Sequence, residues 1–186
     1  MNNKKIDQKT LLDKIGFDID NNKYEESIKH LHDLCNHNPF QTQKFIEVYM
    51  QAWCSKISNM LNNKSFYEAS TRIKTFYMLL PHNHSLNKLI ILYFEKIKKE
   101  NDLKKLIDFN SSIHLSMESY YYYQKNEYEL AEKSAFKCLE NLKKDLKSKL
   151  NFSENLLLIK KSLKNINDKN KAENILNQIL VIIKNY

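Results

Sequence analysis

The chain has 186 residues, and its 30 basic against 22 acidic side chains give a formal net charge of +8. It contains one glycine, Gly16, and two prolines, Pro39 and Pro81. A P-loop or a dinucleotide-binding fingerprint needs several glycines at fixed spacing, so both kinds of nucleotide site are excluded. Sheets with tight hairpins are disfavoured as well, because their turns use glycine at positive φ.

The positive charge is almost all lysine, because Arg72 is the only arginine. Readers of phosphates and bases favour arginine for its bidentate fork, so we expect a solvated lysine surface rather than a nucleic-acid interface. The cysteines Cys35, Cys54 and Cys138 lack framework spacing and suit apolar core positions in a reducing compartment. Without a membrane-length apolar run or a visible secretory signal, we expect a cytoplasmic protein that does not enter membranes.

Amphipathic stretches separated by polar turns predict about ten helices and therefore an all-α fold. Asn38-Pro39 and Leu80-Pro81 should stop helices, because a residue before proline avoids the α region. Ser65 is a plausible N-cap after a run of polar residues. Short loops require consecutive helices to pack antiparallel. The predicted helices span 8–21, 24–37, 41–63, 66–79, 84–100, 102–109, 112–125, 128–145, 153–166 and 168–184.

Similar segments recur along the chain, each with a small residue early in its second helix. These small residues are Ser27, Ala69, Ala131 and Ala172. In the clearest copy the spaced positions are Trp53, Met60, Ala69, Ile73 and Pro81. This spacing resembles the tetratricopeptide repeat, in which the small residue lies where two helices cross closely.

The resemblance implies a right-handed superhelix, that is, a solenoid of antiparallel helix pairs forming one domain over 1–186. The repeats would cover 8–39, 50–81, a degenerate pair at 84–112, then 112–143 and 153–184. Ser27 and Ala69 are 42 residues apart, longer than the family repeat of about 34. HEAT-type repeats of about 40–47 residues, or an irregular helical bundle, are therefore alternatives.

Four consecutive tyrosines, from Tyr120 to Tyr123, are the most suggestive feature for binding. In tetratricopeptide-like solenoids the first helix of each pair lines a concave groove that holds peptides, so the resemblance implies Tyr120 and Tyr123 as anchors. Tyrosine offers a large contact area at low entropy cost. The alternative is that these rings cover a neighbouring helix in the core. The groove residues implied are Tyr120, Tyr123, Gln124, Cys54, Ser58, Leu61, Asn62, Glu95, Lys98 and Lys99.

No motif points to catalysis, to a cofactor or to a metal site. His30, His32 and His37 lie near Cys35 in the sequence. However, His30 and His32 are two residues apart on a predicted helix and cannot face one ion. No pair of carboxylates stands out, so we expect a protein that is not an enzyme and has no catalytic residues, cofactor or metal ligands.

The leading interpretation is a non-catalytic adaptor whose groove binds another protein or a peptide. One alternative is a small tetratricopeptide chaperone of a secretion system, suggested by the segment from Lys23 to Cys35. Others are a repeat-type regulatory sensor and, less favoured, nucleic-acid binding through lysines. The last helix, ending in the apolar run 179–183, lacks the polar outer face expected of a terminal repeat. It is expected to dock a partner, or a second copy in a homodimer.

Overall fold

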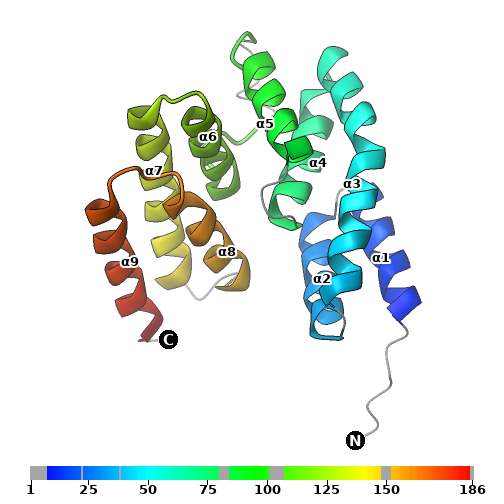
Figure 1. Ribbon diagram of the computed structural model, residues 1–186, viewed down its shortest axis with the longest axis horizontal. Coiled ribbons are helices and arrows are strands. Elements are labelled where there is room, and N and C mark those ends of the chain that lie inside the picture. Colours follow the sequence, from blue (N-terminus) through cyan, green and yellow to red (C-terminus); the bar gives the residue numbers. More distant parts are fainter. Residues whose placement is uncertain are drawn as a thin grey trace, which may run out of the picture. The chain divides into compact units, whose positions relative to one another are not determined.

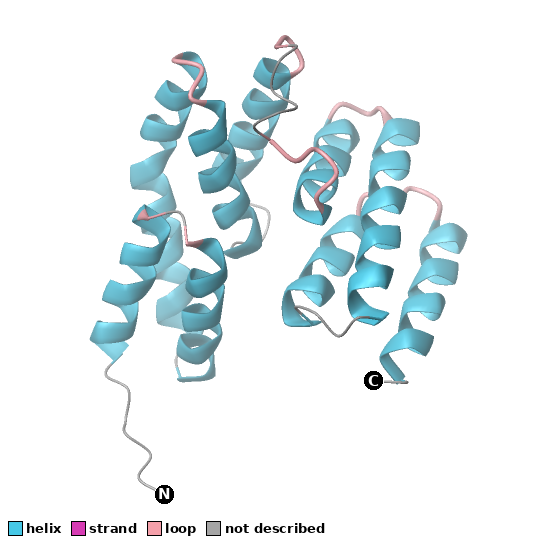
Figure 2. Ribbon diagram, turned by 180° about the vertical axis from the view of Figure 1, so that it is seen from behind, coloured by secondary structure: helices cyan, strands magenta, loops and turns pink. Residues whose placement is uncertain are grey.

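The computed structural model describes residues 8–21, 23–37, 39–79, 84–100, 107–147 and 152–184. Within these ranges the protein consists of nine α-helices and contains no strand (Figures 1 and 2). The all-α prediction is confirmed. The helices are α1 (Gln8–Asp20), α2 (Tyr24–His37), α3 (Pro39–Asn62), α4 (Phe66–Leu79), α5 (His84–Ile97), α6 (Ser112–Gln124), α7 (Tyr128–Lys147), α8 (Phe152–Leu163) and α9 (Lys169–Lys184).

The predicted boundaries agree with the observed ones to within a few residues, with one exception. Of the short helix predicted at 102–109, residues 102–106 lie outside the described ranges and 107–109 are not helical. Pro39 begins α3 instead of preceding it, because proline fits the first helical position, where no N–H is needed. None of the helices in the described ranges is both long and apolar enough to span a bilayer.

The chain divides into two compact units, Met1–Glu100 and Asn101–Tyr186, and we describe each by itself. In the first unit, α1 packs on α2, α3 packs on α4, and α5 packs on both α3 and α4. In the second unit, α7 is the central helix and contacts α6, α8 and α9. The single domain predicted over 1–186 and its superhelical form stay predictions.

The turns that join α3 to α4 and α6 to α7 have the same backbone geometry. Each contains one non-glycine residue in the left-handed region, Lys64 (φ 62°) or Asn126 (φ 61°). The next N–H bonds back to a carbonyl five residues earlier, from Ser65 to Met60 at 2.8 Å and from Glu127 to Tyr122 at 3.0 Å. This is the Schellman arrangement, which satisfies helix-terminal carbonyls without glycine at the cost of some backbone strain.

The turn from α1 to α2 makes the corresponding bond, since the Lys23 N–H donates to the Asp18 carbonyl at 2.8 Å. Four residues after Lys23, Ser65 and Glu127 stand the small residues Ser27, Ala69 and Ala131, and all three are completely buried. The predicted burial of the small residue is thus confirmed in three copies. In the fourth, Ala172 is only half-buried, because α9 packs on α7 rather than forming a close pair with α8.

This difference predicts opposite outcomes for one substitution at two sites. Ala131→Leu should lower the free energy of unfolding by about 1–3 kcal/mol, because the larger side chain would be forced between α6 and α7. Ala172→Leu should change it by less than about 0.5 kcal/mol, because this position is partly open. Thermal unfolding followed by circular dichroism measures both, and equal losses would contradict the account.

Candidate partner-binding surfaces

The predicted groove residues fall into two sets, one in each unit. In the first unit, Asn62, Lys98 and Lys99 are exposed, Cys54, Ser58 and Glu95 are half-buried, and Leu61 is buried. In the second unit, Gln124 is exposed, Tyr123 is half-buried and Tyr120 is buried. The groove as a whole stays a prediction.

Tyr120 does not have the exposure that an anchor needs. Its side chain is only 5% exposed, and burial raises the pKa of its phenol to about 12. The reason is that α6 packs against both α7 and α8, so more than one face of this helix is buried. Tyr120 therefore matches the alternative interpretation, a ring that covers neighbouring helices. Leu61 is likewise a core residue in this structure.

The accessible aromatic surface of this region lies around the turn from α6 to α7, and we call it the tyrosine cluster. It comprises Tyr122, Tyr123 and Tyr128. The rings of Tyr123 and Tyr128 meet edge to face, with centroids 5.5 Å apart. The Tyr128 side chain is 40% exposed, and its hydroxyl donates to Asn126 Oδ1 at 2.9 Å. The Schellman turn thus holds a tyrosine from each helix in one small exposed patch.

The two preceding tyrosines of α6 make a ring contact of their own. Tyr121 and Tyr122 lie with their centroids 5.3 Å apart, and the Lys125 ammonium is 6.0 Å from the Tyr121 ring centre. Tyr122 is half-buried, whereas Tyr121 is buried. Tyr128 was not among the predicted residues. The sequence signal for Tyr128 was its position directly after the polar turn at Asn126. The four consecutive tyrosines before this turn were the more obvious binding candidates.

The only arginine serves the fold of the first unit. Arg72 is buried, with its guanidinium 4.0 Å from the centre of the Trp53 ring. It donates a hydrogen bond to the Asp20 carbonyl, and burial lowers its pKa. The Lys56 ammonium lies 4.3 Å from the same ring centre. Stacking and hydrogen bonding to a carbonyl use guanidinium geometry inside the protein, which leaves no exposed arginine for an external phosphate.

The second candidate surface is α9. Among its described side chains only Ile179 is buried, while Leu176, Leu180 and Val181 are 38%, 42% and 60% exposed. Several large apolar side chains exposed on one helix are typical of an interaction site. This agrees with the prediction of a last helix that is too apolar for a solvated outer face.

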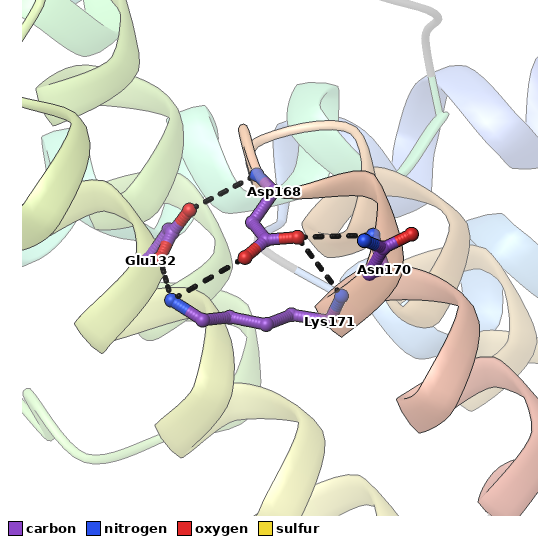
Figure 3. Close-up of polar contacts among 4 residues, drawn as sticks. All are labelled: Glu132, Asp168, Asn170 and Lys171. Carbon is purple, nitrogen blue, oxygen red and sulfur yellow. Dashed lines mark hydrogen bonds and ion pairs between the residues drawn. The ribbon is translucent and has the colours of Figure 1, made fainter.

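Polar contacts fix the start of α9 on α7 (Figure 3). Asp168 Oδ1 accepts from the N–H groups of Asn170 and Lys171 at 3.0 and 3.2 Å, which makes Asp168 the N-cap. Glu132 on α7 accepts from the Asp168 N–H at 3.2 Å and from Lys171 Nζ at 3.3 Å. These bonds connect the first turn of α9 to α7.

Removal of this cap should loosen the helix. We expect Asp168→Ala to lower the free energy of unfolding by about 1 kcal/mol, because two N–H groups of the first turn lose their acceptor. Hydrogen exchange measured by mass spectrometry should speed up in peptides of α9 but not in those of α5. Unchanged exchange in α9 would show that the cap contributes nothing.

The histidines and cysteines are the side chains that could carry other chemistry. His30 Nδ1 lies 2.7 Å from Asp18 Oδ2, while the side chains of His32 and His37 lie outside the described part. Cys138 is buried and Cys54 half-buried, but Cys35 is exposed. The prediction of a core position for Cys35 is therefore wrong, because the buried stripe of α2 runs through Ser27, Leu31 and Leu34. Among the described residues no group of three or more His, Cys, Asp or Glu side chains could hold a metal ion.

A buried polar seam, which sequence reasoning missed, joins α6, α7 and α8. Ser162 Oγ lies 2.9 Å from Ser116 Oγ and 3.3 Å from Cys138 Sγ. Asn165 Nδ2 donates to Ser119 Oγ at 2.8 Å. Burial raises the pKa of the Cys138 thiol to about 12. A thiol of such high pKa is protonated at neutral pH and unreactive, so the seam has a packing role.

Comparisons with models of known protein families, with curated proteins and with solved structures found no match for this chain. The resemblance to tetratricopeptide repeats therefore rests on the residues and turns described above.

Proposed function

We propose that this protein is a non-catalytic adaptor that binds another polypeptide through exposed aromatic and apolar side chains on a tetratricopeptide-like helical scaffold. The observation that carries the proposal is the tyrosine cluster, in which Tyr123 and Tyr128 form a partly exposed edge-to-face pair at the turn from α6 to α7. Partly exposed tyrosines bury a large area and keep a polar tip for hydrogen bonding when a partner docks.

The scaffold supports the same proposal. Three helix pairs share the same backbone hydrogen bond across the turn and a fully buried small residue, as expected of repeated helical hairpins. Such hairpins present their outer side chains on rigid elements, which reduces the entropy lost on binding. A secretion chaperone and a regulatory sensor are particular forms of this function, and a partner's identity would distinguish them.

Nucleic-acid binding through lysines is the competing proposal, and two lysines engaged by other side chains weigh against it. The Lys143 ammonium bonds to Glu140 at 2.6 Å and to Gln178 at 2.8 Å, and Lys64 pairs with Glu100 at 2.8 Å. An acidic neighbour offsets part of the field that would attract a phosphate. Added salt should weaken a phosphate-driven complex steeply and an aromatic one only slightly.

The experiment is capture from an extract of cells that make the protein, with and without nuclease. We expect one protein to be retained in stoichiometric amount despite nuclease treatment, and to be lost with Tyr123→Ala/Tyr128→Ala. The matched control is Tyr67→Ala, an exposed tyrosine on α4 that lies outside the cluster. Retained material that disappears with nuclease, or that is equally lost in the Tyr67 variant, would contradict the proposal.

A further inference from the structure

The exposed edge of α9 has a regular order of apolar and charged side chains, which indicates what kind of surface could pack against it. Leu176 and Leu180 are four residues apart and therefore lie one above the other on the same side of the helix. On this side, Glu173 precedes Leu176 by one turn and Lys184 follows Leu180 by one turn, and both are exposed. The edge thus has an apolar centre, an acidic N-terminal end and a basic C-terminal end.

This order is self-complementary when two such helices run antiparallel. A two-fold axis passing beside position 178 places Leu176 of one copy against Leu180 of the other, twice. The same axis brings Glu173 of each copy to within one residue of Lys184 of the other. A parallel pairing would instead place like charges side by side at both ends, which is unfavourable. A closed two-fold dimer needs this kind of self-matching surface.

We propose that α9 docks a second copy of this chain, forming an antiparallel two-helix interface across Leu176 and Leu180 that is flanked by two Glu173–Lys184 ion pairs. The N-cap on Asp168 and its anchor on Glu132 keep α9 ready for docking, so little order is lost on association. The interface uses one helix per copy, so it belongs to the small, reversible class. This inference does not depend on the tyrosine cluster.

Sedimentation of the purified full chain from about 1 to 200 μM tests the proposal, because small interfaces dissociate in this range. We expect a reversible monomer–dimer equilibrium in the wild type and only monomer in Leu176→Asp/Leu180→Asp. A wild type that stays monomeric throughout, or a dimer that survives in this variant, overturns the proposal.

Charge reversal tests the antiparallel arrangement with variants at exposed positions, where folding is not at risk. Glu173→Lys alone and Lys184→Glu alone should each weaken dimerisation roughly five-fold, because two ion pairs become two repulsions. The double variant Glu173→Lys/Lys184→Glu should regain the affinity of the wild type. Failure of the double variant to recover would overturn the proposed pairing. Thermal unfolding, measured at a concentration at which all three variants are monomeric, should show that each is folded.

Discussion

Replacement of Tyr93 by alanine should lower the free energy of unfolding by about 3–5 kcal/mol, the largest loss that we expect from a single substitution. Tyr93 is fully buried on α5, where its ring meets Phe94 edge to face with centroids 5.1 Å apart. Its hydroxyl donates to Ser70 Oγ on α4 at 3.0 Å. Burial raises the pKa of this phenol to about 12, so it stays protonated and can donate at any physiological pH.

Two further variants separate packing from hydrogen bonding at this site. Tyr93→Phe keeps the ring and should cost about 0.5–1.5 kcal/mol, the net value of one hydrogen bond. The exposed Tyr67→Ala on α4 should stay within about 0.5 kcal/mol of the wild type. Urea unfolding followed by the fluorescence of Trp53 is suitable, because this single tryptophan lies in the same unit. If the Tyr93→Ala protein is as stable as Tyr67→Ala, Tyr93 does not lie in the core of the first unit.

The second large effect concerns the pH dependence of stability. Lys161 on α8 is buried, and burial, with a smaller contribution from the nearby charge of Lys164, lowers the pKa of its ammonium to about 7. In the unfolded chain its pKa returns to about 10.4. Between these two values the unfolded state binds more protons than the folded state, so stability should increase as the pH rises.

The free energy of unfolding should increase by roughly 1.5 kcal/mol between about pH 7 and pH 8.5. This follows from a limiting slope of about 1.4 kcal/mol per pH unit. Above about pH 8.5 the increase should level off, because the Cys138 thiol, whose folded-state pKa is raised to about 12, ionises first in the unfolded chain and so contributes a slope of opposite sign. Lys161→Met should be more stable than the wild type at pH 7 and should lose this dependence. Urea unfolding followed by circular dichroism measures the free energy of unfolding at each pH. If this free energy changes with pH in Lys161→Met as it does in the wild type, Lys161 is not the source of the pH dependence.

Local sequence signals were enough to predict the nine helices of the described residues. The apolar period of α5 and polar turns such as Asn62-Asn63-Lys64 are properties of short segments, so no knowledge of distant contacts was needed. The burial of Ser27, Ala69 and Ala131 could also be predicted, because a close helix crossing next to a turn tolerates only a small residue.

The side chains that remain accessible could not be predicted in the same way, because accessibility depends on which helices pack together. Tyr120 is buried because α6 has two neighbours in its unit, and Ala172 is half-buried because α9 lies on α7. Lys161 resembled any surface lysine, since nothing in its own segment shows that other side chains cover it. The apolar character of α9 was visible in the sequence. The order of Glu173, Leu176, Leu180 and Lys184 along its exposed side could be recognised only once the structure showed which side of the helix is exposed.

Site-specific photo-crosslinking in cells that make the protein tests polypeptide binding most directly. A benzophenone amino acid replaces Tyr123 in the tyrosine cluster or, as the control, Lys133, an exposed residue of α7 outside it. The account predicts one discrete crosslinked protein at position 123, resistant to nuclease, and none at position 133. Crosslinks only to nucleic acid, or the same set of products at both positions, would contradict it.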